Sequence, residues 1–177
     1  MNAMSRCTIL MLLAAASGLG LADEEAGWKA TLVDDDEPGT PLVVSGTVYD
    51  ADGVTPRSGI RLYVYNTDAE GTYSRDGANE SVRRINGRMV TDGRGRYEFH
   101  TVKPGSYPGN RIPAHIHYVV SGSGLGERRL ELRFQGDPFL SADAQSRELA
   151  KSTFGSIRPL EQQSDGTLRC VFDIRLD

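Results

Sequence analysis

The sequence predicts a mainly β protein whose strands form a β-sandwich, with little helix. Three observations support this fold class. Short segments of alternating apolar and polar residues recur along the chain from residue 41 onward. Turn-forming combinations of glycine, proline and aspartate separate these segments at short intervals. One segment alone, Ala142 to Lys151, has a helical pattern.

Residues 1–22 are expected to be a signal peptide and not part of the fold. Arg6 precedes an apolar run from Cys7 to Leu19, small residues follow, and acidic residues begin at Asp23. This layout is typical of export, and the run is too short for a convincing membrane span. We therefore expect an exported protein, periplasmic or secreted, without membrane attachment after cleavage.

Residues 23–40 are predicted to be an acidic leader, and residues 41–177 a single folded domain. The run from Asp34 to Glu37 is interpreted as a solvated segment and not as a metal site. A mature chain of about 155 residues suits one domain with one core. Cleavage removes Cys7, so Cys170 has no disulfide partner and is expected to be buried in a strand.

The strands are expected where alternation is clearest and turn residues flank it. In Gly59–Asn66 the apolar residues fall on one face and Arg61, Tyr63 and Tyr65 on the other. Asp92–Gly95 is a hairpin signal between its two flanking segments. The expected strands are Pro41–Tyr49, Gly59–Asn66, Arg88–Thr91, Arg96–Val102, His115–Ser121, Arg129–Gln135 and Thr167–Arg175. Of these, His115–Ser121 and Arg129–Gln135 are expected to pair across the glycine-rich segment Gly122–Gly126.

Two histidines one residue apart mark the candidate functional region. On a strand, His115 and His117 point to the same face, and Ile116 between them points into the other layer. Two imidazoles on one face can hold a metal ion, although ordinary strand residues also occur at this spacing. Just upstream, Tyr107 and Arg111 lie in a loop that its prolines stiffen.

Four separated motifs resemble the intradiol ring-cleaving dioxygenases, the family of catechol and protocatechuate dioxygenases. The family's signature is similar to the run Y-P-G-N-R-I-P-A-H-I-H, which ends at His117. The segment of its other iron-binding tyrosine is similar to Asp68–Ser74, and the lead-in to the second tyrosine is similar to Gly87–Gly105. A strand ending of the family is similar to Phe134–Pro138. The resemblance covers Val43 to Pro138 and implies an antiparallel, Greek-key sandwich in a single-domain exported form.

The resemblance implies a ferric iron site made by Tyr73, Tyr107, His115 and His117. Phenolate oxygen suits a hard, highly charged ion, and coordination ionises a phenol whose free pKa is about 10. In the family, a catechol chelates the iron while one tyrosinate, here Tyr107, leaves the metal and accepts a catechol proton. Dioxygen then opens the ring between its two hydroxyl-bearing carbons, giving a cis,cis-muconate. No carboxylate accompanies the histidine motif, which counts against a ferrous site of two histidines and one carboxylate.

Further site residues follow from the same match. Arg111 is implied to stabilise charge on the substrate ring, and Ile112 is inserted after it relative to the commoner family pattern. Glu131 stands where the family has a glutamine, so an acid there would alter hydrogen bonding to substrate or ligand. Arg83 and Arg84 are candidates for contact with a substrate carboxylate, although solvated charges are the commoner case.

Two other classes of protein stay open. Binding modules of transthyretin-like or carboxypeptidase-accessory type share the G-T-V-Y-D and Y-E-F patterns, but they do not require two tyrosines and two histidines together. A zinc or copper protein could use the histidines alone, and visible colour separates ferric tyrosinate from zinc. The net charge of −4 argues against a nucleic-acid partner. The expected partners are a catechol and dioxygen, with homo-oligomerisation left open.

Overall fold

The computed structural model describes residues 26–74, 82–122 and 124–177. The predicted signal peptide (residues 1–22, with Cys7) and the first three residues of the predicted leader lie outside the described residues. Within the described ranges, no helix is both long enough and apolar enough to cross a membrane.

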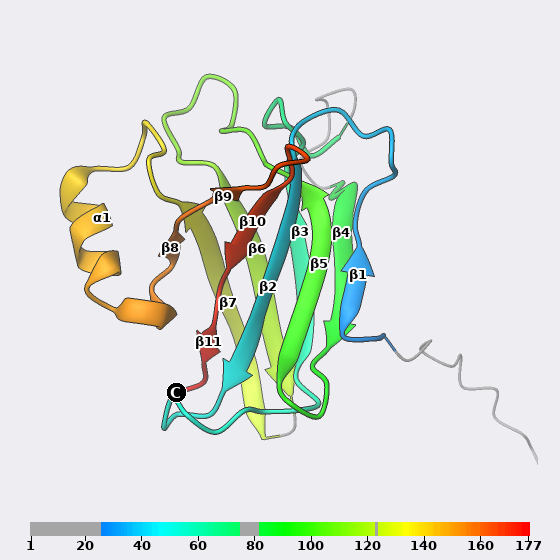
Figure 1. Cartoon of the computed structure of the whole chain (residues 1–177), viewed down its shortest axis with the longest axis vertical. Helices are drawn as coiled ribbons and strands as arrows, with labels where there is room; N and C mark the ends of the chain where they lie inside the picture. Colours follow the sequence, from blue (N-terminus) through cyan, green and yellow to red (C-terminus); the bar gives the residue numbers. More distant parts are fainter. Residues whose placement is uncertain (1–25, 75–81, 123) are drawn as a thin grey trace, which may run out of the picture.

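Two β-sheets lie face to face around one apolar core (Figure 1). The first sheet contains, in spatial order, β1 (Lys29–Thr31), β5 (Arg96–Val102), β2 (Pro41–Tyr49), β10 (Leu168–Val171) and β9 (Glu161–Gln162), with β11 (Ile174–Arg175) also paired to β2. The second contains β4 (Ile85–Val90), β3 (Arg61–Asn66), β6 (His115–Gly122), β7 (Leu125–Phe134) and β8 (Ile157–Arg158). The helices in the described ranges are α1 (Ala142–Leu149) and the short 3-10 helix η1 (Ser152–Phe154). The predicted mainly β class with little helix is confirmed.

Alternating side chains from both sheets form the core. Val64 of β3 and Ile116 of β6 are 0% exposed, and they belong to one cluster with Val44 and Phe99 of the first sheet. The predicted position of Ile116, in the layer opposite the two histidines, is therefore confirmed. Strands β6 and β7 pair antiparallel across their glycine-rich turn, also as predicted.

The expected antiparallel sandwich is observed only in part, because each sheet is mixed. The parallel pairs are β1 with β5, β10 and β11 with β2, and β7 with β8. Each of them joins strands that are separated by a long connection. Such a connection, unlike a short hairpin, lets the chain return in the same direction. Between β7 and β8 the connection includes α1 (Figure 1).

The predicted hairpin at Asp92–Gly95 is wrong. The turn forms, with the Gly95 N–H donating to the Asp92 carbonyl at 2.9 Å and the Asp92 N–H donating to the Arg96 carbonyl at 3.1 Å. However, β4 before it pairs with β3, and β5 after it pairs with β2. The turn therefore carries the chain from one sheet to the other. Turn chemistry fixes the local reversal, whereas the pairing of the flanking strands depends on which layer buries them.

The predicted leader is partly built into the fold. Strand β1 extends the first sheet, and Leu32, only 8% exposed, joins the core. The Glu37 carboxylate, predicted to be solvated, accepts two hydrogen bonds from the Arg84 guanidinium at 2.6 and 2.7 Å. Its side chain is 4% exposed. Through Glu37, the acidic run therefore helps to hold residues 26–40 against the rest of the domain.

The predicted last strand, Thr167–Arg175, is interrupted at Phe172 and Asp173. The Asp173 carboxylate accepts the backbone N–H of Thr47 at 2.8 Å, in place of a ladder carbonyl. The chain also approaches β2 closely there, because a Cβ built at Gly46 would lie 2.0 Å from the Phe172 carbonyl oxygen. Glycine is therefore required at position 46, and the segment forms two short strands.

Cys170 is buried in β10, as predicted, with 2% of its surface exposed. Burial raises the pKa of its thiol to about 12, so the thiol is protonated and unreactive at neutral pH. We expect Cys170→Ala to lower the free energy of unfolding by about 1–2 kcal/mol, because it removes one small core group. Chemical denaturation measures this change. A disulfide-linked dimer on non-reducing gels would contradict the assignment.

Candidate metal centre and substrate pocket

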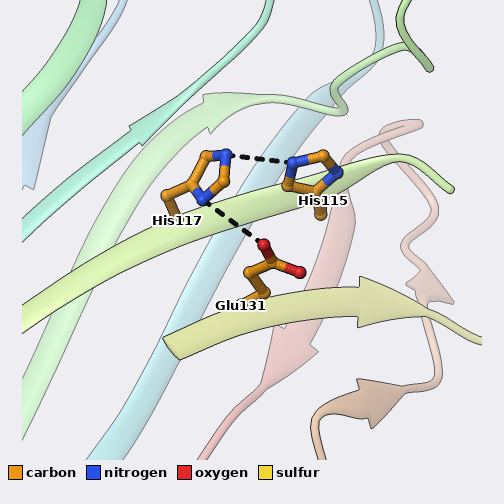
Figure 2. Close-up of side chains that lie close together, drawn as sticks. All are labelled: His115, His117 and Glu131. Atoms are coloured by element: carbon orange, nitrogen blue, oxygen red, sulfur yellow. Dashed lines mark hydrogen bonds and ion pairs between the residues drawn. The ribbon is translucent and has the colours of Figure 1, made fainter. Parts of the chain in front are cut away.

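Strand β6 presents His115 and His117 on one face, with their rings at an interplanar angle of 87° (Figure 2). The Nδ1 of His115 lies 2.7 Å from the carbonyl oxygen of Pro113, so Nδ1–H donates and the Nε2 lone pair points away from the backbone. The Nε2 atoms of the two histidines are 3.0 Å apart. Both imidazoles therefore offer a nitrogen to the same point.

Two tyrosines from separate loops bring their hydroxyl oxygens to the same point. The hydroxyl oxygens of Tyr73 and Tyr107 are 2.6 Å apart. The Tyr107 oxygen lies 3.1 Å from Nε2 of His115 and 3.4 Å from Nε2 of His117. The structure thus brings together all four residues that the sequence assigned to a metal, with two phenol oxygens and two imidazole nitrogens converging.

The loop that carries Tyr73 is held by its own hydrogen bonds and by close contact with the second tyrosine loop. The Asp68 carboxylate accepts the N–H and the hydroxyl of Thr72 at 2.8 and 2.7 Å. Gly71 has a φ of +84°, and a Cβ there would lie 1.9 Å from the Ser106 carbonyl oxygen. A side chain at position 71 would push the two loops, and hence the two phenols, apart.

Burial sets the protonation state of the metal-free cluster. It raises the pKa of the Tyr73 phenol, with a further contribution from the hydrogen bond to Tyr107. It lowers the pKa of His117 to about 4, and the neighbouring His115 adds to this effect. At neutral pH, Tyr73 is therefore a neutral phenol and His117 a neutral imidazole. Neutral imidazole is the form that binds metal, and a bound cation would displace the phenol proton.

A pocket of about 610 Å³ opens beside the four donors. Its lining includes three of them and several residues of the neighbouring loops: Tyr65, Gly71, Thr72, Tyr73, Ser74, Arg83, Tyr107, Pro108, Asn110 and His117. The Tyr65 ring stacks on His117 with 4.6 Å between centroids. The sequence had not indicated Tyr65 or Asn110 as site residues. Alternation placed Tyr65 on the polar face of its strand, but only the pairing of β3 with β6 places it opposite His117.

The two candidate arginines after the first tyrosine occupy different environments. Arg83 lines the pocket, with its guanidinium carbon 4.1 Å from the Tyr65 ring centroid. Arg84 instead pairs with Glu37, and one of its nitrogens also lies 3.6 Å from the Asp68 carboxylate. The structure therefore brings Arg83, and not Arg84, to the pocket.

Arg111 lies away from the pocket lining. Its side chain is exposed, and its guanidinium carbon lies 5.7 Å from the Phe139 ring centroid. The inserted Ile112 is 42% exposed, whereas Ala114 is buried and donates its N–H to Asp137 at 3.0 Å. The extra residue is thus accommodated by an outward loop before β6.

A carboxylate does accompany the histidine pair, contrary to the expectation from the motif. Glu131 lies opposite His117 on the adjacent strand, and its Oε1 is 3.8 Å from Nδ1 of His117 (Figure 2). Its other oxygen accepts a hydrogen bond from Arg133 at 2.5 Å. Because Glu131 faces Nδ1 while the other donors face Nε2, it lies behind the imidazole. This position suits orientation of His117 better than direct ligation.

We expect Glu131→Ala to weaken metal binding by about 10-fold, because an unsupported His117 ring is no longer held in its orientation. Competition with a chelator measures this affinity. Glu127→Ala is the matched control, since Glu127 is on the same strand and pairs with Arg129 at 2.9 Å instead of facing a histidine. Equal metal affinity in both variants would contradict a positioning role for Glu131.

The family model described as Dioxygenase matches residues 21–177 of the chain. The protocatechuate 3,4-dioxygenase beta chain of Burkholderia cepacia is 36% identical over 140 residues, which cover 72% of this chain and 58% of that protein. Catechol 1,2-dioxygenase of Acinetobacter baylyi is 30% identical over 141 residues, covering 69% and 45%. The chain thus spans about half the length of these relatives.

Solved structures of similar proteins share the fold. Catechol 1,2-dioxygenase from Pseudomonas arvilla C-1 superposes with a TM-score of 0.68 at 24% identity, covering 85% of this chain and 56% of that chain. The dioxygenase domain of a dioxygenase and carbohydrate-binding protein fusion from Streptomyces sp. SirexAA-E has a TM-score of 0.65 at 26% identity, covering 83% and 86%. Both likenesses extend over more than four fifths of this chain.

Proposed function

Because the chain belongs to the intradiol ring-cleavage dioxygenase family, we propose that it is a non-haem ferric iron dioxygenase that opens a catechol-type ring between the two hydroxyl-bearing carbons. One observation carries the proposal: the hydroxyl oxygens of Tyr73 and Tyr107 converge with Nε2 of His115 and His117. The antiparallel strands would then be the family's Greek-key core, to which the terminal segments add parallel strands.

The four donors fit a ferric ion on chemical grounds. Phenolate oxygen is a hard ligand that suits a small, highly charged cation, and neutral imidazole completes the set. Two phenol oxygens only 2.6 Å apart in a half-buried site suit a shared cation, because each can give it an electron pair once its proton has left. Tyr73, Tyr107, His115 and His117 would hold the iron.

The chain's own residues would then bind the catechol and manage its protons. When bound, ferric iron supplies the Lewis acidity that activates a chelated catechol toward dioxygen. Tyr107, whose hydroxyl lies at the centre of the cluster, would accept a catechol proton at its phenolate oxygen. Tyr65 would form an aromatic wall that fixes the His117 ring, and Arg83 would place a positive charge at the pocket. A substrate carboxylate is the group that Arg83 would meet.

A substrate panel tests the proposed reaction. Iron-loaded protein is mixed with catechol, protocatechuate, hydroxyquinol or chlorinated catechols while oxygen uptake and ultraviolet absorbance are followed. We expect at least one catechol to consume one dioxygen per ring and to give a muconate-type product. A colourless protein that consumes no oxygen with any of them, after expression with ample iron, would overturn the proposal. Colour also separates ferric tyrosinate from a zinc site.

We also propose that the protein is exported, periplasmic or secreted, because residues 1–22 have the layout of a signal peptide. Sequencing the N-terminus of protein recovered from the periplasm or the medium should give a start near Asp23. A protein that retains Met1 and stays in the cytoplasm would contradict export. Size-exclusion chromatography of the same material reports whether it forms the homo-oligomer left open above.

A further inference from the structure

The outer face of the second sheet carries a strip of tyrosines and arginines that starts at the pocket. Tyr65 and Tyr63 of β3 both point to this face, and their ring centroids are 5.6 Å apart. The guanidinium of Arg83 lies 4.1 Å from the Tyr65 centroid, and that of Arg88 lies 4.8 Å from the Tyr63 centroid. The tyrosine–arginine contact thus recurs at Tyr63, which lies two residues before Tyr65 on the strand, a distance of about 7 Å along it.

Three neighbouring hollows with shared lining residues follow one another along this face away from the four donors. The pocket shares Tyr65 and His117 with an adjacent hollow of about 520 Å³. That hollow shares Val119 with a third one of about 470 Å³, whose lining includes Tyr63 and Arg88. Helix α1 lies against β8 at the edge of the sheet and not across β3, β4 and β6 (Figure 1). Helix α1 therefore leaves the strip uncovered.

The charge along the strip is positive, although the chain carries a net charge of −4. Among the residues that the structure describes, no carboxylate lines the pocket or the third hollow. Arg83 lines the pocket, and Arg61 and Arg88 line the third hollow. Within the described ranges, none of these three arginines forms an ion pair. The carboxylates on this face belong to Glu127 and Glu131 of β7, and each forms an ion pair with an arginine of the same strand. A planar guanidinium beside an aromatic ring suits recognition of a carboxylate attached to a ring.

We propose that this strip is a second substrate subsite, and that the substrate is a catechol carrying an extended, aromatic and anionic substituent. The inference rests on the proposed function, because the catechol end lies at the four donors. The substituent leaves the pocket past the edge of Tyr65, whose ring contacts His117 and Arg83; its own ring lies against the half-buried Tyr63, and its carboxylate meets Arg88 and Arg61. A bare catechol fills the pocket alone and makes none of the outer contacts.

Anaerobic titration of iron-loaded protein tests the subsite, with the change in colour on binding as the signal. The probes are catechol, a catechol joined to a phenyl ring, and a catechol joined to a benzoate ring. We expect the benzoate-bearing probe to bind wild-type protein about 10-fold more tightly than catechol. Arg88→Gln should remove most of that advantage for the benzoate-bearing probe only, and Tyr63→Ala should weaken both two-ring probes.

Arg169→Gln is the matched control, because Arg169 is an exposed arginine on β10 of the other sheet. It should leave all three dissociation constants unchanged. A second readout needs no metal: calorimetry of metal-free protein with biphenyl-4-carboxylate should detect weak binding that Arg88→Gln abolishes and Arg169→Gln preserves. Thermal melting of each variant confirms folding, and Arg88 is exposed, so its replacement leaves the core intact.

The outcomes separate this inference from the proposed function. If ring cleavage occurs but the benzoate-bearing probe binds no better than catechol, the subsite is refuted and the dioxygenase proposal stands. Equal losses in Arg88→Gln and Arg169→Gln would refute it as well. If no catechol binds the iron or is cleaved, the dioxygenase proposal fails, and the substrate assigned here fails with it.

Discussion

His115→Ala is expected to lose its iron, its colour and its ring-cleaving activity together. His115 is 7% exposed, its Nδ1–H donates to the Pro113 carbonyl, and its Nε2 lies 3.1 Å from the Tyr107 oxygen. Alanine leaves a gap that water fills without the fixed direction of the imidazole. Because supporting groups around metal ligands already change affinity by about 10- to 100-fold, loss of a ligand should exceed about 10²-fold. Metal analysis after dialysis and the visible spectrum measure it.

The remaining histidine of the chain supplies the control for this experiment. His100 is an exposed residue on β5, 3.5 Å from the Glu98 carboxylate and remote from the four donors. His100→Ala should keep full iron and full colour, whereas His117→Ala should behave like His115→Ala. If His115→Ala still binds one iron with an unchanged tyrosinate band, the histidine pair is not part of the metal site.

The parts of the fold that could be predicted are those that depend on neighbours in the sequence. Alternation located β3 and β5, and the glycine-rich turn correctly joined β6 to β7. The shared face of His115 and His117 also follows from the period of a strand alone. These properties need no knowledge of which distant strands lie side by side.

The parts that could not be predicted depend on lateral strand pairing. Tyr65 reaches His117 because β3 pairs with β6 in one particular register, and Glu131 reaches it because β7 pairs on the other side. A shift of either strand by one residue would turn these side chains into the core. The hairpin expected at Asp92–Gly95 failed for the same reason, since its flanks pair in different sheets.

The sequence shows where charged residues occur, but it does not show which of them form ion pairs with one another. The acidic run before the domain suggested a solvated segment, yet Glu37 is held by both terminal nitrogens of Arg84. That pair spans 47 residues of sequence, so no local pattern reports it. It also removes Arg84 from the candidate substrate contacts and leaves Arg83 as the arginine at the pocket.

Arg111→Ala is expected to keep its iron and its colour, and to darken when a catechol is added, yet to cleave slowly. The resemblance aligns Arg111 with the cation that stabilises charge growing on the substrate ring. In the structure its side chain is exposed, on a loop that continues from Tyr107, and it rests 5.7 Å from the Phe139 ring centroid. An exposed contact of this kind costs little to break, so a bound, negatively charged catechol can draw the guanidinium inward. Removing a group that stabilises charge in the transition state typically lowers turnover by about 10²- to 10³-fold.

Steady-state oxygen uptake and anaerobic binding of catechol, measured on the same protein, separate turnover from affinity. Phe139→Ala is the control, because it removes the ring beside Arg111 and keeps the cation; its turnover should stay within a few-fold of wild type. If Arg111→Ala cleaves catechol at the wild-type rate, Arg111 is a surface residue. Arg83, which lines the pocket and lies over Tyr65, would then be the cation whose replacement slows cleavage. Arg83→Ala, assayed with bare catechol, decides between the two positions.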